Sequence, residues 1–137
     1  MVHRAAAEAQ TRGDDETARD MLSGWAAGAQ TDRVGLGETH YRLGMLYADP
    51  NSSVGDSALA RREFQELLDL SPGHPRAAEA GVMLALLDEL EGLRARSADL
   101  TDELGELKGV KAALVADLEK KDQELKSIKQ VLLQKKP

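Results

Sequence analysis

The side chains that could bind a metal in this 137-residue chain are three histidines and a run of oxygen-bearing residues at 49–56. His3, His40 and His74 lie in different segments. None has a carboxylate or a second histidine four residues away, the spacing that presents two ligands on one helix face. We therefore expect no histidine metal site.

The segment Asp49 to Asp56 (DPNSSVGD) is superficially similar to a calcium loop. Its glycine falls one place late, and the twelfth position is Ala60 rather than glutamate. No phosphate-binding glycine loop or nucleophile elbow occurs, and the absence of cysteine excludes thiolate zinc sites, thiol redox chemistry and disulfides. The sequence predicts a protein that is not an enzyme and has no cofactor.

Charge and hydropathy exclude two further classes. The net charge of -6 argues against nucleic acid as the main partner. The longest mostly apolar stretch, Gly81–Leu87, is too short to span a membrane. His3 and Arg4 follow Met1 without an apolar segment, so we expect no secretion signal in these residues.

The composition changes along the chain. Residues 1–85 hold eight Arg, no Lys and all four aromatic residues, whereas residues 86–137 hold eight Lys, no aromatic residue and many Leu and Glu. β-branched residues are sparse and strict alternation is absent, so strands find no support. The sequence predicts an all-α fold with a helical head at 1–85, a coiled-coil helix at 86–134 and a frayed end at 135–137.

The head contains a predicted helical hairpin. An amphipathic helix at 38–48 is broken by Asp49-Pro50, because proline disfavours helix at the preceding residue. A second helix is expected to begin near Asp56 or Ser57, either of which can cap it, and to end at Ser71-Pro72-Gly73. Such a pair forms two antiparallel helices.

This hairpin resembles a tetratricopeptide (TPR) repeat. His40 stands where that family has tryptophan, and the loop between the helices is about four residues longer than the usual unit allows. The resemblance implies helix pairs in which small residues permit close approach and larger ones fill the gap. An unrelated helical bundle, with Tyr47 and Phe64 as ordinary core residues, remains the alternative. The matching residues are Leu43, Gly44, Tyr47, Ala60, Phe64, Leu67 and Pro72.

A weaker copy of the pattern lies upstream. A helix at 2–12 and a turn at Gly13-Asp14 precede Ala18, which corresponds to Ala60 in a period of 42 residues. The resemblance thus implies a fold of two TPR-like hairpins followed by a long C-terminal helix that forms a coiled coil. The start of that helix is expected to cover the second hairpin through Ala77, Ala78, Val82 and Leu86.

The resemblance also implies a function and a compartment. TPR heads hold a segment of another protein in a groove, and Thr39, Arg42 and Asp49 are the groove candidates here. The long loops and the Pro72–Ala77 junction look like those of bacterial envelope TPR lipoproteins, which are periplasmic scaffolds without catalysis. Membership would imply a signal peptide and a lipidated cysteine upstream of Met1; otherwise the cytoplasm is expected.

The C-terminal part carries apolar residues at alternating steps of four and three, which is typical of a coiled coil. Ser97, Lys111 and Lys121 interrupt the pattern. Because water-exposed leucines gain roughly 1.5–3 kcal/mol each on burial, a partner helix is expected. The oligomerisation residues are Leu90, Leu93, Leu100, Leu104, Leu107, Leu114, Leu118, Leu125, Ile128 and Leu132.

We expect this helix to form a homodimer. In a parallel pair Glu103 faces Lys108 and Glu124 faces Lys129 of the other copy, which is attractive, whereas two further carboxylates, Asp117 and Asp122, repel. The sequence leaves parallel and antiparallel pairing open. The predicted function is a scaffold or adaptor that binds a protein partner through the head and dimerises through the tail. Alternatively, the tail pairs with a different protein, such as a sensor or membrane-complex subunit, and the head is a cap.

Overall fold

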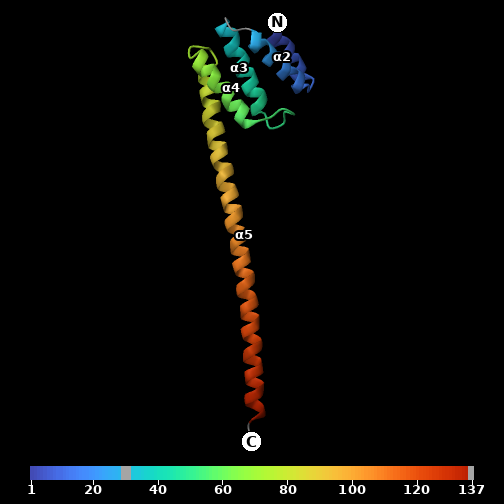
Figure 1. Cartoon of the computed structure of the whole chain (residues 1–137), viewed down its shortest axis with the longest axis vertical. Helices are drawn as coiled ribbons and strands as arrows, with labels where there is room; N and C mark the ends of the chain where they lie inside the picture. Colours follow the sequence, from blue (N-terminus) through green and yellow to red (C-terminus); the bar gives the residue numbers. More distant parts are fainter. Residues whose placement is uncertain (29–31, 136–137) are drawn as a thin grey trace. The chain divides into compact units, whose positions relative to one another are not determined.

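The computed structural model describes residues 1–28 and 32–135 and shows five helices there, with no strand (Figure 1). They are α1 (Val2–Thr11), α2 (Asp15–Gly28), α3 (Arg33–Ala48), α4 (Ser57–Leu70) and α5 (Ala77–Gln134). The prediction of an all-α fold with a long C-terminal helix is confirmed. The chain divides into two compact units, Met1–Glu91 and Gly92–Pro137, which we call the head and the tail. The first unit ends six residues beyond the domain boundary expected from composition. The sequence predicts a frayed end at 135–137, and residues 136 and 137 of it lie outside the residues that the structure describes.

Two aspartates set the starts of α3 and α4. The side chain of Asp56 accepts hydrogen bonds from the backbone N–H of Ala58 and Leu59 at 2.8 and 3.0 Å, so α4 begins where the sequence predicts. Asp32 caps α3 in the same way, accepting from the N–H of Gly35 at 3.0 Å. The helix therefore starts at Arg33, five residues before the predicted position.

A glycine in the part of α3 that precedes the predicted helix has a packing role. A Cβ on Gly37 would lie 2.8 Å from the His74 ring, so glycine is needed where α3 passes the α4–α5 connection. The same connection is tied to α3 by the Ser71 hydroxyl, which donates to the Arg33 carbonyl at 3.0 Å. Tertiary contact, which composition alone does not reveal, overrides the low helix propensity of glycine here.

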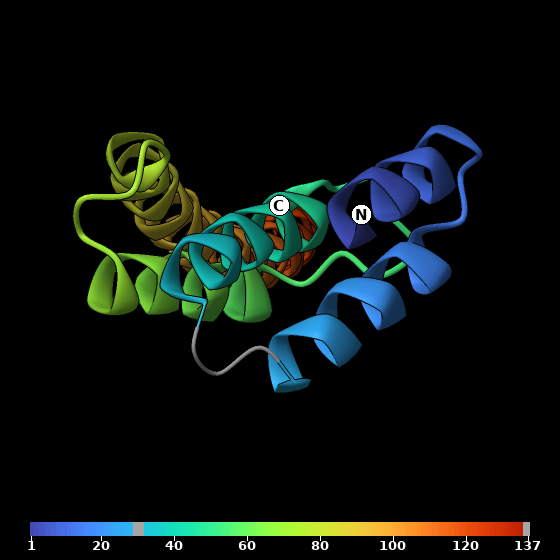
Figure 2. The same cartoon turned by 90° about the horizontal axis from the view of Figure 1, so that it is seen from above.

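The head has two layers of helices, with α1, α3 and the start of α5 in one and α2 and α4 in the other (Figure 2). The two layers approach closely at Gly44 on α3, where an added Cβ would lie 2.6 Å from the Phe64 ring on α4. Phe64 is fully buried and its ring makes an edge contact with Tyr41 at 6.2 Å between centroids. This glycine lets α3 and α4 pack closely in the second hairpin.

The start of α5 completes the head, but through a different face from the one predicted. Ala80 and Leu87 are buried, and Met83 and Leu84 pack partly against the same core. Met83 and Leu84 each lie three or four residues from Ala80 and from Leu87, so the four residues share one helix face. Of the residues expected to cover the second hairpin, Ala77 does pack against the core, whereas Ala78, Val82 and Leu86 are exposed. The prediction for those three was wrong because they lie on the other side of the helix.

Polar contacts support the same packing. The Tyr41 hydroxyl donates to Glu79 on α5 at 2.7 Å, and Arg76 lies 5.0 Å from the Tyr41 ring centroid. The hydrogen bond from Tyr41, with the ion pair from Arg76 at 3.0 Å, holds the pKa of Glu79 below its usual range. Further along α5, Arg61 of α4 pairs with Asp88 at 2.8 Å and with Glu91.

Candidate interaction surfaces

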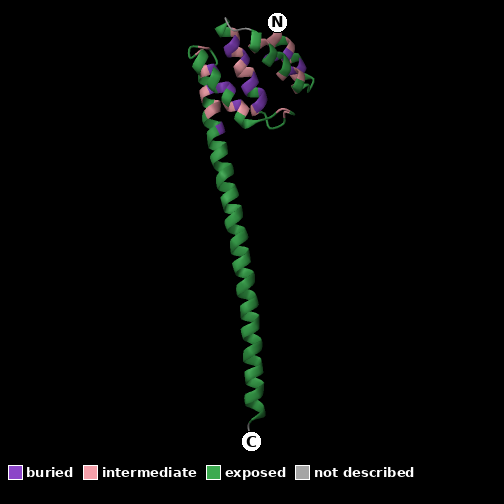
Figure 3. Ribbon diagram, in the orientation of Figure 1, coloured by how far each residue is buried: buried purple, intermediate pink, exposed green. Residues whose placement is uncertain are grey.

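The tail presents a row of large apolar side chains to solvent. Every residue from 92 to 135 is exposed (Figure 3). The predicted coiled-coil residues range in exposure from 40% at Leu90 to 68% at Leu118. The structure thus places every residue of this set on an open helical surface, with none of them covered by the described residues.

The row is a continuous seam along one side of the helix. Steps of four and three residues return to nearly the same face on each pair of turns, because the helix has 3.6 residues per turn. Two valines widen the seam in its middle: Val110 and Val115 are 56% and 44% exposed and flank Lys111. Sequence reasoning did not include these valines, although their places next to seam positions were readable from the heptad count.

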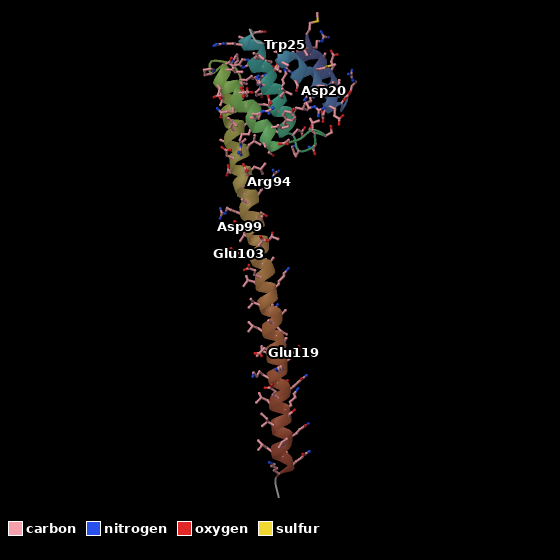
Figure 4. All side chains as sticks on the ribbon, viewed as in Figure 1. Asp20, Trp25, Arg94, Asp99, Glu103 and Glu119 are labelled. Atoms are coloured by element: carbon pink, nitrogen blue, oxygen red, sulfur yellow. The ribbon has the colours of Figure 1, made fainter. Side chains whose placement is uncertain are left out.

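Charged side chains lie beside the seam, among them Glu103, which is labelled in Figure 4. Within the helix, Lys126 pairs with Asp122 at 3.1 Å and Lys121 approaches Glu124 at 3.7 Å. Ion pairs this exposed contribute little to helix stability. Their value lies in setting which charges a second helix would meet.

In the head, the TPR-like packing positions lie together in the core. Six of the seven are buried, and Pro72 is exposed in the connection between α4 and α5. The equivalent residues of the first hairpin, Ala18 and Leu22, are also fully buried. The buried six are Leu43, Gly44, Tyr47, Ala60, Phe64 and Leu67.

One of the three groove candidates is misplaced. Thr39 is fully buried, and its hydroxyl donates to the Gly35 carbonyl at 2.9 Å and meets His3 Nε2 at 2.7 Å. It cannot contact a partner, because it lies on the face of α3 that packs against His3 of α1. Arg42 is held by Glu38, to which its Nε donates at 2.7 Å. Asp49 is exposed, and its side chain accepts from the N–H of Asn51 at 2.8 Å.

Asp49 borders a hollow of about 450 Å³ between α1, α3 and α5. Its apolar wall includes Met45, which is 39% exposed, and Met83. Asp15 adds a second carboxylate to the rim and accepts from the N–H of Ser53 at 3.2 Å. Sequence reasoning missed the methionines, because the hollow forms only when three helices far apart in the chain come together.

A second hollow, of about 550 Å³, lies at the other end of α3. Trp25, labelled in Figure 4, forms part of its wall and meets the His3 ring edge-on at 5.3 Å between centroids. Asp32, Glu38 and Arg76 also line it. Burial, with the positive charge of Arg42 nearby, lowers the pKa of His3 and favours its neutral form.

The buried titratable pair of the head joins α3 to α4. His40 Nδ1 lies 2.8 Å from Glu63 Oε2, and Arg62 donates to the other carboxylate oxygen at 2.9 Å. Burial would raise the pKa of Glu63, but the hydrogen bonds from His40 and Arg62 outweigh it and hold that pKa below the usual value. Glu63 is only 5% exposed, so this carboxylate is part of the packing between helices.

The other residues considered as metal ligands, the 49–56 segment and His74, make hydrogen bonds within the fold. In the 49–56 segment, the Asp56 N–H donates to the Tyr47 carbonyl at 2.8 Å, and its side chain caps α4. His74 Nδ1 accepts from the Arg76 N–H at 3.1 Å. Over residues 1–28 and 32–135, no group of three or more histidine, aspartate or glutamate side chains is placed to hold a metal ion. Within the same ranges, no helix is both long and apolar enough to cross a membrane.

Comparison with known proteins gives no relative: no family model, no curated protein and no solved structure matches this chain.

Proposed function

We propose that this protein is a scaffold or adaptor, which assembles with a second copy of itself through the tail and binds a segment of another protein through the head. The observation that carries the proposal is the seam of ten large apolar side chains along α5, exposed by 40–68%, of which Leu90 belongs to the end of the head and the other nine to the tail. Such a surface gains free energy by pairing with another helix, since apolar area is removed from water. Exposed apolar patches of this extent mark interaction sites.

The head supports the second half of the proposal. Its two-layer arrangement and the Gly44–Phe64 contact agree with the packing that the TPR resemblance implies. The hollow beside Met45 and Met83 lies on the layer formed by the first helix of each pair, the surface that would receive a peptide. Methionine side chains adapt to varied apolar partners, and Asp15 and Asp49 at the rim would favour a basic one.

The mass of the full-length chain in solution tests the assembly half. Sedimentation equilibrium is expected to give about twice the chain mass of 14.8 kDa at tens of micromolar. A single-chain mass at that concentration would contradict the proposal.

The head is tested by separating binding from assembly. Met45→Lys places a charge in the hollow and is expected to abolish partner binding while leaving the dimer mass unchanged. The matched control is Met21→Lys on α2, a methionine of nearly the same exposure, 38% against 39%, that does not line the hollow. Partners retained by Met21→Lys and lost by Met45→Lys support a binding head, whereas equal retention by both variants would contradict it.

A heterotypic tail is the second candidate, because two seam positions hold lysine. Lys111 and Lys121 occupy seam positions, where a different chain could present carboxylates. In that case the purified protein is monomeric and its tail poorly helical until the other chain is added. Circular dichroism of the full-length protein against concentration distinguishes the two candidates, because only self-association makes helix content rise with concentration.

The envelope location implied by the TPR lipoprotein resemblance is also a proposal. Recovery of the native protein with a lipid-modified cysteine in its N-terminal peptide supports it, and an unmodified cytoplasmic product contradicts it.

A further inference from the structure

We infer that the tail pairs with the tail of a second copy in parallel and in register, so that each seam residue meets its own counterpart. This inference rests on the proposed self-assembly and adds its orientation. Three observations carry it: the placement of the polar seam residues, the charges beside the seam, and the exposed valines at its centre.

The polar seam residues favour this alignment. The seam from Leu90 to Leu132 has thirteen positions, of which Ser97, Lys111 and Lys121 are polar. In register and parallel, the polar residues meet one another and ten of thirteen layers are wholly apolar. Shifting one helix by seven residues leaves five apolar layers of eleven, since each polar residue then lies opposite an apolar residue in two separate layers. Register is therefore strongly specified.

Antiparallel pairing fits the seam less well. Its best alignment sets Leu93 against Leu125 and gives eight apolar layers of twelve, with Lys111 packed against Leu107. A lysine at an inner seam position lowers stability but specifies register and a small number of strands in parallel coiled coils. The aliphatic stem of Lys111 would be covered by Val110 of the other copy while its ammonium group reaches solvent.

The charges beside the seam also favour parallel over antiparallel pairing. In the parallel pair, Glu103 faces Lys108 and Glu124 faces Lys129, each contact occurring twice. The antiparallel alignment instead sets Glu103 near Asp117 and Lys108 near its own counterpart.

Antiparallel pairing has attractive contacts too, but they are fewer. It would bring Arg96 to Glu124, while Arg94 meets an acid in both alignments and does not discriminate. The same alignment thus keeps an attraction at Glu124 and turns the favourable contacts of Glu103 and Lys108 into repulsive ones.

The parallel pair also buries the two exposed valines, and its one repulsive contact involves a carboxylate that is already paired. Val110 and Val115, both exposed in the single chain, face each other across the parallel pair and bury each other twice. Asp117 faces Asp122, which is repulsive, but Asp122 is already paired with Lys126 at 3.1 Å on its own helix. Because the head precedes the seam in the chain, both heads are attached at the same end of the paired helices.

Single cysteine substitutions in the full-length chain test this inference, because the chain has no cysteine of its own. Leu93→Cys and Leu125→Cys are oxidised separately and as a mixture, with Leu133→Cys as the control on the same helix outside the seam. The parallel pair brings each seam cysteine to its counterpart. Each single variant is then expected to form its disulfide dimer roughly 100-fold faster than the control, from millimolar effective concentration against about ten micromolar chain. The mass of each reduced variant is measured by sedimentation equilibrium in the same experiment.

The outcomes separate the inference from the proposed function. Crosslinking only in the mixture of Leu93→Cys with Leu125→Cys overturns the parallel orientation and leaves self-assembly standing. A dimeric mass with no fast crosslink in any sample overturns the in-register alignment. A monomeric mass in every sample, the unsubstituted chain included, overturns the self-assembly on which the inference rests.

Discussion

Leu107→Ala should dissociate the proposed dimer without unfolding either chain. Leu107 is 65% exposed in the single chain, so this fraction of its side chain is what pairing removes from water. Removing three carbons costs about 0.8 kcal/mol each, scaled by that fraction, or about 1.6 kcal/mol per chain. A dimer loses two such side chains, about 3 kcal/mol in all. This loss raises the dissociation constant of the dimer by about 100-fold. Alanine is the best helix former, so reduced helix propensity does not contribute.

The matched control is Leu133→Ala. Leu133 is the same residue type on the same helix and is 59% exposed, but it stands outside the alternating pattern. Its substitution is expected to change the dissociation constant less than about threefold, within the range of ordinary surface substitutions. Sedimentation equilibrium over a hundredfold concentration range measures both variants. Equal weakening by the two substitutions, or none by either, would refute the reasoning that the seam is the contact surface.

Three further predictions concern the head and the seam. Gly44→Ala should destabilise α3 and α4 by about 1–3 kcal/mol, because its Cβ would lie 2.6 Å from the Phe64 ring. Gly24→Ala, with open space around its Cβ, should stabilise α2 by up to about 1 kcal/mol, and amide hydrogen exchange of these helices distinguishes the two. The pKa of Glu63 is lower in the folded head than its usual value of 4.5. Ionised Glu63 therefore stabilises the folded head fully above pH 4.5, and this stabilisation is lost as pH falls through the folded pKa. Hydrogen exchange of α4 in Glu63→Gln against pH should lack that acid-side loss, and an unchanged profile would contradict the assignment. Lys111→Leu should tighten self-association at least tenfold and admit larger oligomers in sedimentation, whereas weaker association would count against Lys111 as a seam residue.

The elements that the sequence predicted well are those with local signals. The Asp56 cap and the alternating leucines of the tail act within a few residues, so type and spacing are enough to place them. The start of α3 and the covering face of α5 were misjudged. Gly35 and Gly37 lie close to Trp25 and His74, partners that lie outside any local window and leave no room for a larger residue.

The candidate site follows the same rule. The seam could be read from the chain because one helix carries all of it. The hollow beside Met45 needs Asp15 and Met83, each more than 25 residues away in the chain, and neither carries a motif that would mark it. Thr39 was misassigned because its contact with His3 joins residues 36 apart.

Trp25 has a practical consequence. It is the only tryptophan of the chain and lies in the head, against the His3 ring, while the tail has no aromatic residue. Indole fluorescence therefore reports on the head alone, and quenching by the imidazolium of His3 would make it sensitive to acid. A spectroscopist can thus follow the melting of one unit optically in the intact molecule, with no label, whatever the other unit is doing.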